Sequence, residues 1–240
     1  MRPSRAKPAT SAVDAVLEKR NVPDMVAPCP VRGLYAVTPD TAESDLLYQR
    51  VEAILRGGAR VLQYRSKNPE RRLRLTQARG LLELCRTYAA LLIVNDDVSI
   101  AQTIGADGVH VGRDDASIAT ARAALGPRLI GASCYDSLER AMQAQRAGAD
   151  YVAFGSFFPS SVKPQAVRAP IDLLHAARAR LDVPIVAIGG ITPDTAPALI
   201  DAGADAVAVV SALFEATDPS AAARAFTRLF QSRHKGMNVL

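Results

Sequence analysis

One short stretch of the sequence carries an amide, a guanidinium and an ammonium group at alternating positions. Gln63, Arg65 and Lys67 alternate with Tyr64 and Ser66 in QYRSK, at the end of a β-branched apolar run. Because strand side chains alternate between two faces, the first three share one side. An arginine within a buried strand needs an anionic partner, and arginine with lysine suits phosphate. The stretch predicts a binding site for an anion such as a diphosphate.

Carboxylates gather after the next two apolar runs. The run LLIVN continues into Asp96-Asp97, and GVHV is followed by GRDD, which ends at Asp115. Mg²⁺ takes one or two carboxylates together with substrate phosphate oxygens, so these residues with Asn95 predict a Mg²⁺ site. One aspartate of each pair also fits a helix N-cap. We expect His110 to be a neutral histidine that is hydrogen-bonded at a strand end.

Further along the chain, small and polar residues follow the remaining runs. Ser133 ends LIGAS, and Gly189-Gly190 ends PIVAIGG before ITP. Exposed backbone N–H groups there, with those of Val210-Ser211, predict a phosphate cradle. The segment Ser160-Ser161-Val162-Lys163 lies in a long loop held between prolines and predicts a lid that closes on an anion.

The elements that must position these residues repeat along the chain. Eight short β-branched runs alternate with helical patterns of about ten to fifteen residues, as in βαβ units. Gly-Ala-Asp or Gly-Ala-Arg recurs at the junction between a helix and the next run, where glycine favours the helix end. Eight units predict a closed (β/α)₈ TIM barrel, with a doubly wound open sheet as the alternative. The predicted strands are 34–38, 61–65, 91–95, 108–111, 129–133, 151–155, 184–189 and 206–210, and the last helix is 218–231.

Composition limits the class of protein. The chain has 240 residues and a net charge of +5, but the basic excess lies at its two ends and leaves no basic stripe for nucleic acid. No apolar run reaches the length of a membrane span. Three cysteines without a CxxC pair indicate a reducing, cytoplasmic location. We expect residues 1–32 to be a flexible or loosely docked basic extension, 33–232 the barrel and 233–240 a tail.

Several long motifs together make the sequence resemble the thiamine-phosphate synthase family. They are GLYAVTPD, LQYRSK, IVNDD, GADGVHVGRDD, IGAS, GADYVAFGSFFPSSVKP and VAIGGITPDTAPALIDAGADAVAVVSALFEATDP, in that order from about Gly33 to Pro219. The resemblance implies a transferase of thiamine biosynthesis. Its members join 4-amino-2-methyl-5-(diphosphooxymethyl)pyrimidine to a thiazole phosphate, with Mg²⁺, and release thiamine phosphate and pyrophosphate. It implies small-molecule substrates and neither nucleic acid nor membrane as partners, and it leaves homo-oligomerisation open.

The resemblance also implies roles for particular residues. The residues that match the pyrimidine-diphosphate site are Gln63, Tyr64, Arg65, Ser66, Lys67, Asn95, Ser133 and Lys163, and among them Arg65 and Lys163 are the expected catalytic residues. Asp96 and Asp115 match the Mg²⁺ ligands. The matches to the thiazole-phosphate site are Ser160, Ser161, Val162, Gly190, Val210 and Ser211.

Some positions depart from the family pattern, which affects the expected substrate affinity more than the reaction type, and two alternative functions remain. Val162 stands where a hydroxyl is common, Arg113 where glutamine is common, and Tyr135 where many relatives have histidine. One alternative is a thiazole tautomerase-like barrel, which Tyr135 disfavours because the tautomerase is expected to use that histidine. The other is a catalytically silent barrel that binds thiamine phosphates as a regulator. A complete diphosphate and metal set favours the synthase over both.

Overall fold

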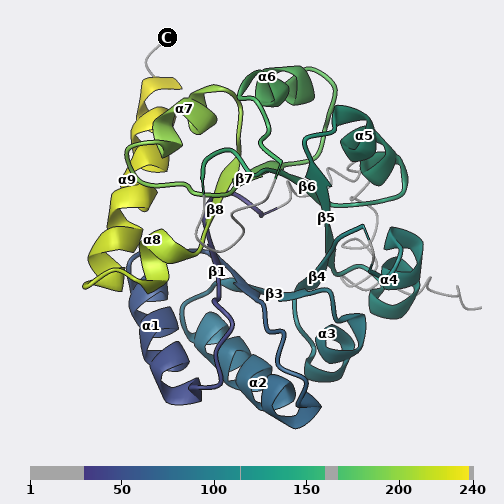
Figure 1. Cartoon of the computed structure of the whole chain (residues 1–240), viewed down its shortest axis with the longest axis vertical. Helices are drawn as coiled ribbons and strands as arrows, with labels where there is room; N and C mark the ends of the chain where they lie inside the picture. Colours follow the sequence, from purple (N-terminus) through teal and green to yellow (C-terminus); the bar gives the residue numbers. More distant parts are fainter. Residues whose placement is uncertain (1–29, 114, 160–166, 238–240) are drawn as a thin grey trace, which may run out of the picture.

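The strands close into a ring. In this computed structural model, which describes residues 30–113, 115–159 and 167–237, eight parallel strands run in the order β1 to β8, and β8 pairs with β1 (Figure 1). The strands are β1 (Gly33–Val37), β2 (Val61–Tyr64), β3 (Leu91–Asn95), β4 (Gly108–Val111), β5 (Leu129–Tyr135), β6 (Tyr151–Phe154), β7 (Ile185–Ile188) and β8 (Ala206–Val209). The predicted TIM barrel is confirmed, and the β1–β8 pairing excludes the open sheet.

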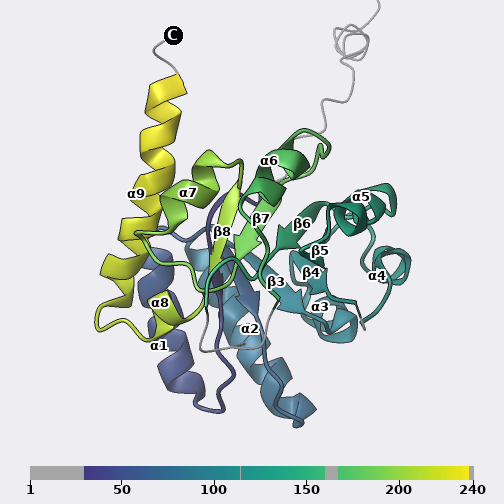
Figure 2. The same ribbon diagram turned by 45° about the horizontal axis from the view of Figure 1, so that its top comes forward.

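Helices surround the ring on its outside (Figures 1 and 2). They are α1 (Ser44–Arg56), α2 (Arg71–Thr87), α3 (Val98–Ile104), α4 (Ile118–Leu125), α5 (Leu138–Arg146), α6 (Asp172–Arg178), α7 (Ala196–Asp201), α8 (Ser211–Phe214) and α9 (Pro219–Met237). The last helix begins within a residue of the predicted position and extends further. The short α8 is an addition, and β5 runs two residues beyond the predicted end because its register shifts between Ser133 and Tyr135.

Two apolar cores follow from the alternation of strand side chains. The larger lies between the strands and the helices, and includes Leu62, Leu92 and Val152. The smaller fills the inside of the barrel with Tyr35, Val61, Ile93 and other residues. Both faces of each strand are therefore buried, which explains why the strands read as continuous apolar runs. Within the described part of the chain, no helix is long and apolar enough to cross a membrane.

The recurring Gly-Ala-Asp motif ties each strand to its neighbour at the amino-terminal end of the barrel. Gly105 has φ +72°, the left-handed backbone that lets glycine end α3. Asp107 then accepts a hydrogen bond from the Leu92 N–H at 2.7 Å, and Asp150 accepts one from Ile130 at the same distance. Asp205 repeats the contact with Ile185 at 2.9 Å. The motif marks the junction of paired strands as well as a helix end.

The residues just before β1 also belong to this end of the barrel. Val31 is fully buried and packs with the interior core, beside Tyr35 and Val61. The Arg32 guanidinium lies 3.9 Å from Asp205, which precedes β8. The packed part of the described chain thus begins with Val31, two residues before Gly33.

Candidate active site

A cavity of about 600 Å³ opens inside the barrel at the carboxyl ends of the strands. Residues from strands on opposite sides of the ring line it. The predicted site residues among them are Gln63, Arg65, Asn95, Ser133, Gly190, Val210 and Ser211. Active sites of TIM barrels form at this end, so the structure brings these seven residues, predicted for two different substrates, into one cavity.

A second cavity of about 510 Å³ adjoins the first, because Asn95 lines both. Ser66, Lys67 and Asp96 line the second cavity, together with Arg74. Predicted anion and metal residues therefore line a cavity next to the one inside the barrel. A substrate with a ring and a diphosphate group could place one part in each.

Arg65 is held at its backbone and leaves its charged group available. The Thr38 hydroxyl accepts a hydrogen bond from the Arg65 N–H at 2.9 Å and lies 3.0 Å from the Arg65 carbonyl. The end of β1 thereby fixes the end of β2. Among the described residues, no carboxylate forms an ion pair with the Arg65 guanidinium. A half-buried arginine without a counter-charge is a ready anion site.

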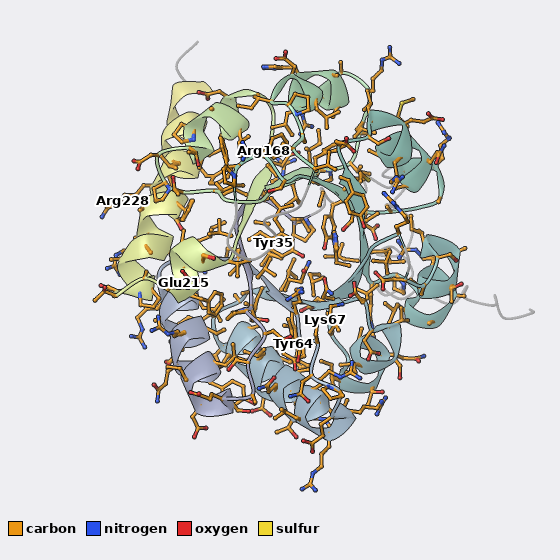
Figure 3. All side chains as sticks on the ribbon, in the orientation of Figure 1. Tyr35, Tyr64, Lys67, Arg168, Glu215 and Arg228 are labelled. Atoms are coloured by element: carbon orange, nitrogen blue, oxygen red, sulfur yellow. The ribbon has the colours of Figure 1, made fainter. Side chains whose placement is uncertain are left out.

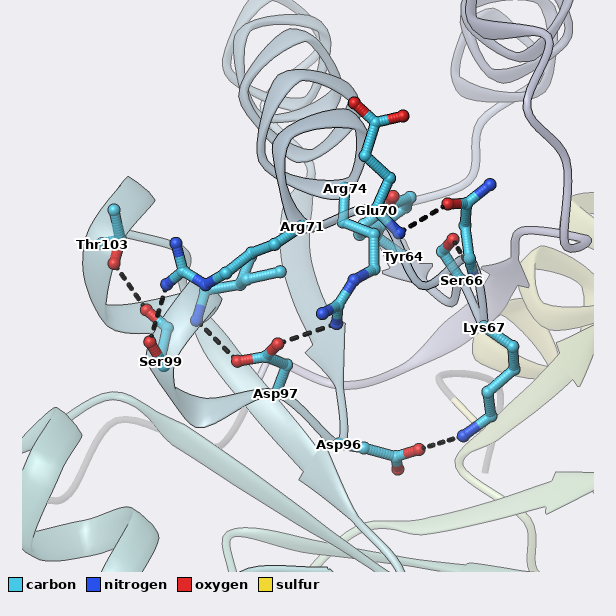
Figure 4. Close-up of polar contacts among 12 residues, drawn as sticks. Tyr64, Ser66, Lys67, Glu70, Arg71, Arg74, Asp96, Asp97, Ser99 and Thr103 are labelled. Carbon is cyan, nitrogen blue, oxygen red and sulfur yellow. Dashed lines mark hydrogen bonds and ion pairs between the residues drawn. The ribbon is translucent and has the colours of Figure 1, made fainter.

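Lys67 and Asp96 form a salt bridge at the mouth of the second cavity. The Lys67 Nζ lies 2.7 Å from Asp96 Oδ2 (Figure 4). Asp40, which sequence reasoning did not select, accepts a hydrogen bond from the Lys67 N–H at 3.0 Å and positions the loop. Its place in the TPD motif, opposite QYRSK, is the signal that could have found it.

The two predicted metal ligands lie against each other. Burial would raise the pKa of Asp96, but hydrogen bonds to Lys67 and Asp115 outweigh it and lower that pKa. Burial and the Asp96 carboxylate raise the pKa of Asp115, whose Oδ2 also accepts a hydrogen bond from the Gly112 N–H at 2.7 Å. Two carboxylates held this close repel each other, and a divalent cation between them would be favourable.

The donor set fits a cation that needs few protein ligands. In the part of the chain that the structure describes, no cluster of three or more His, Cys, Asp or Glu side chains could hold a metal. Two carboxylates suit Mg²⁺, which completes its octahedron with phosphate oxygens and water. Asp97 has a different role: it caps α3 by accepting from the Ile100 N–H at 2.8 Å and pairs with Arg74 at 2.9 Å (Figure 4).

Tyr64 lies apart from the other predicted residues. Its ring is buried between β2 and α2, and its hydroxyl donates to the Gln77 side chain at 2.8 Å. The alternation that points Gln63 and Arg65 into the barrel turns Tyr64 outward. The Tyr64 side chain is therefore directed away from the cavity, contrary to the expected contact. Ser66 leans on Asp40, with its Oγ 3.4 Å from Asp40 Oδ1.

The predicted phosphate cradle requires a glycine at position 190. Gly190 has φ +62°, and a Cβ there would stand 2.1 Å from the Pro159 carbonyl oxygen. Any side chain would collide with the loop after β6. Ser211 begins α8 and lines the same cavity. The lid residues Ser160, Ser161, Val162 and Lys163 lie outside the described residues, as does Asp114.

The floor of the larger cavity carries polar residues that the sequence reasoning did not combine. His110 is buried and hydrogen-bonded, as expected, with its Nε2 2.9 Å from Ser133 Oγ. Burial lowers the pKa of His110 to about 4, against the opposing effect of Asp96, so the ring is neutral. Tyr35 stands within the ring of strands (Figure 3) and receives a hydrogen bond from Gln63 at 2.9 Å. The signal in the sequence that could have found this group is the presence of polar side chains at strand positions that face the barrel interior.

The fold and this cavity define a TIM barrel with a polar cavity at the carboxyl ends of its strands, where enzymes of this fold have their active sites. The model of the family described as thiamine monophosphate synthase matches residues 34–213. The thiamine-phosphate synthase of Azoarcus sp. (strain BH72) is 56% identical over 201 residues, covering 83% of this chain and 98% of that protein. The enzyme of Methylobacillus flagellatus is 56% identical over 202 residues, 84% of this chain and 96% of its own.

Solved structures agree with the sequence relatives. A thiamine phosphate pyrophosphorylase from Pyrococcus furiosus superposes with a TM-score of 0.76 at 34% identity, over 83% of this chain and 96% of that one. The chain belongs to the thiamine monophosphate synthase family. The predicted family, fold and transferase class are confirmed.

Proposed function

We propose that this protein joins 4-amino-2-methyl-5-(diphosphooxymethyl)pyrimidine to a thiazole phosphate and releases pyrophosphate. Family membership supports the reaction, and one observation carries its assignment to this cavity. Residues predicted for both substrates, among them Gln63, Ser133 and Gly190, line one cavity, and Lys67 and Asp96 line a neighbouring cavity that shares Asn95 with it. The two substrates would therefore meet inside one enclosed space.

The roles of the residues follow from their charges. The pyrimidine ring would lie over Gln63 and Ser133, with its diphosphate toward Arg65 and Lys67. Gly190 and Ser211 would hold the thiazole phosphate across the cavity. Asp96 and Asp115 would hold Mg²⁺, which supplies positive charge for the departing diphosphate. Lys163, on the proposed lid, would add a further positive charge.

The protein contributes to this reaction mainly by positioning the two substrates and by stabilising charge. The bond between the pyrimidine methylene and the diphosphate oxygen breaks, and the electron pair leaves with pyrophosphate. The thiazole nitrogen then donates its pair to the methylene and forms the new C–N bond. Fixed cations stabilise charge that develops on the leaving group, and holding the acceptor nearby removes an entropic barrier.

A direct assay tests the function. Purified protein is mixed with both substrates and Mg²⁺, and thiamine phosphate and pyrophosphate are measured, with EDTA in a parallel sample. Equal formation of both products, abolished by EDTA, is the expected result. Binding of the thiazole phosphate without product would instead support the tautomerase-like or silent barrel, in which Tyr135 and Val162 become the residues to examine.

Arg65 gives the sharpest variant. We expect Arg65→Gln to lower kcat/KM for the pyrimidine diphosphate by about 10²- to 10³-fold, the typical effect of losing one charge-stabilising donor. Arg79→Gln is the matched control, because Arg79 lies exposed on the outer face of α2. Lys163→Ala should chiefly lower kcat, and unchanged turnover would remove Lys163 from the mechanism.

We also propose a cytoplasmic location. Cys85 and Cys134 are buried free thiols. A chain that keeps unpaired thiols suits a reducing compartment. Fractionation of cells that express the tagged protein would test this assignment.

A further inference from the structure

The floor of the larger cavity joins five polar side chains in one continuous chain of hydrogen bonds. Gln63 Nε2 donates to the Tyr35 hydroxyl at 2.9 Å, which lies 2.9 Å from the Tyr151 hydroxyl. The Tyr151 hydroxyl lies 3.2 Å from His110 Nδ1, and His110 Nε2 lies 2.9 Å from Ser133 Oγ. We call these five residues the floor relay. The two ends, Gln63 and Ser133, line the cavity.

The relay crosses the barrel because one glycine leaves space for it. His110 on β4, Gly131 on β5 and Tyr151 on β6 are register partners across the sheet. A Cβ at Gly131 would stand 2.1 Å from the Tyr151 ring. Since Gly131 has no side chain, the Tyr151 ring occupies its place and approaches His110, with ring centroids 5.5 Å apart.

Burial increases the contribution of these hydrogen bonds to stability. Tyr151 is fully buried, Tyr35 is 1% exposed and His110 is 7% exposed, in a core that is otherwise apolar. A buried hydroxyl or imidazole without a partner is strongly destabilising. The five groups therefore depend on one another for their hydrogen bonds, and the position of each proton constrains the next.

The direction of the protons can be followed from Gln63. Its amide N–H donates to Tyr35; if the Tyr35 hydroxyl in turn donates to the Tyr151 oxygen, the Tyr151 hydroxyl donates to His110 Nδ1. Neutral imidazole carries one proton, which then lies on Nε2 and is donated to Ser133. With its oxygen so engaged, the Ser133 hydroxyl proton is left to point into the cavity.

We propose that Tyr35, Tyr151 and His110 act as positioning residues, whose hydrogen bonds make Ser133 a donor and hold the Gln63 amide at the cavity floor. This inference deepens the proposed function, on which its ligand rests: an aminopyrimidine, whose ring nitrogens accept hydrogen bonds. A donor fixed at Ser133 selects one orientation of that ring. The orientation in turn places the reacting methylene toward the thiazole side.

Tyr151 is the residue at which to test the relay. It links the Tyr35 and His110 halves, yet it lies behind the cavity rather than among the residues that line it. Tyr151→Phe keeps the ring over Gly131 and removes the hydroxyl. We expect the KM for the pyrimidine diphosphate to rise about three- to tenfold, the effect of one neutral hydrogen bond. The KM for the thiazole phosphate should stay within twofold.

Tyr88→Phe is the matched control. Tyr88 donates to Glu52 at 2.9 Å between the outer helices, so it loses a comparable hydrogen bond far from the floor. It should leave both KM values unchanged. Equal increases in both KM values for Tyr151→Phe would indicate general loosening of the barrel and would overturn the proposal.

A double-mutant cycle connects Tyr151 to Ser133. If Tyr151 acts through Ser133, adding Tyr151→Phe to Ser133→Ala should raise the pyrimidine KM no further than Ser133→Ala alone. Additive effects would show that Tyr151 acts by another route. They would overturn the relay as the cause.

A spectroscopic measurement separates the relay from the proposed function. Side-chain ¹⁵N NMR, assigned with His175→Gln and His234→Gln, should show His110 protonated on Nε2 in the protein without substrate. An Nδ1-protonated ring would reverse the direction of the relay and overturn the proposal. A wild-type protein without turnover would defeat the proposed function, and the tautomer would still decide the relay.

Discussion

His110 is a neutral, buried imidazole that contacts Tyr151 inside the barrel. Burial keeps its proton affinity low, although Asp96 lies near enough to raise it. Tyr151 and Ser133 occupy its two nitrogens. Protonating the ring would place a second proton where a hydroxyl proton already stands. The residue therefore contributes to stability only while it is neutral.

The expected consequence is a loss of stability in mild acid. The pKa of His110 is lowered from 6.5 to about 4, so in this pH range the unfolded chain binds a proton that the folded chain does not. Stability from this group is present above pH 6.5 and declines as the pH falls toward about 4. By pH 5 the free energy of unfolding should drop by about 2 kcal/mol.

Urea unfolding at several pH values measures this slope. His110→Gln should flatten the decline between pH 6.5 and 4.5 by about one proton. His175→Gln, at an exposed position on α6, should keep the wild-type slope. An unchanged slope in His110→Gln would show that other groups account for the acid sensitivity.

The buried thiols give a second test at this scale. Burial raises the pKa of Cys85 to about 12, assisted by Asp107, and that of Cys134 to about 12 despite Arg140 nearby. In a Cys29→Ser variant, we expect native protein at pH 8 to resist iodoacetamide and unfolded protein to be labelled twice. Mass spectrometry counts the labels. Labelling of Cys134 in the native protein would show that burial does not protect this thiol.

At the scale of elements, the Gly-Ala-Asp junctions couple each helix end to the neighbouring strand. Asp150 accepts from the Ile130 N–H and pairs with Arg122 at 2.6 Å. The Asp150 carboxylate thus accepts a backbone hydrogen bond at the end of β5, in place of a carbonyl group of a neighbouring strand. Asp107 and Asp205 make the equivalent contacts at β3 and β7.

Removing one such carboxylate should cost stability without changing turnover. We expect Asp150→Ala to lower the free energy of unfolding by about 1–2 kcal/mol, allowing for its partial exposure. Asp201→Ala, at the exposed end of α7, should have little effect. Chemical unfolding and the synthase assay on both variants provide the comparison. Lost activity in a folded Asp150→Ala protein would show that this junction also affects the active site at the opposite end of the barrel.

Sequence periodicity predicts this architecture well because strands and helices here repeat regularly. It also places Gln63, Arg65 and Ser133 at the cavity, since alternation decides which side chains face inward. It does not reveal the floor relay. Tyr35 and Tyr151 are 116 residues apart, and their contact with His110 depends on an absent side chain at Gly131. The floor relay can be recognised only once the strand register is known.

At the scale of the whole molecule, Val31 closes the amino-terminal end of the barrel. It is fully buried beside Tyr35, and Arg32 reaches Asp205 across the β1–β8 seam. The opposite end holds the cavity and the polar floor. One end of the barrel is therefore packed for stability, while the other is left open for substrates.

Val31→Ala tests this division. Two buried methyl groups are removed, so we expect the free energy of unfolding to fall by about 2 kcal/mol, with KM and kcat unchanged. Leu46→Ala removes more carbon from a residue that is 46% exposed and should cost less. Thermal and urea unfolding give the stabilities. An equal loss of unfolding free energy in both variants would show that burial of Val31 does not stabilise the barrel more than the half-exposed Leu46 does.

The floor relay also has a consequence for how the chain folds. Its members come from β1, β2, β4, β5 and β6, so a half-folded chain that lacks β6 has Tyr35 and His110 but no group to join them. Such long-range contacts form late, after many loops have closed. The chain has no tryptophan, so its six tyrosines supply the intrinsic fluorescence. Comparing the refolding of Tyr151→Phe with that of wild type would report when β6 joins the barrel, and the floor relay should be completed in that same step.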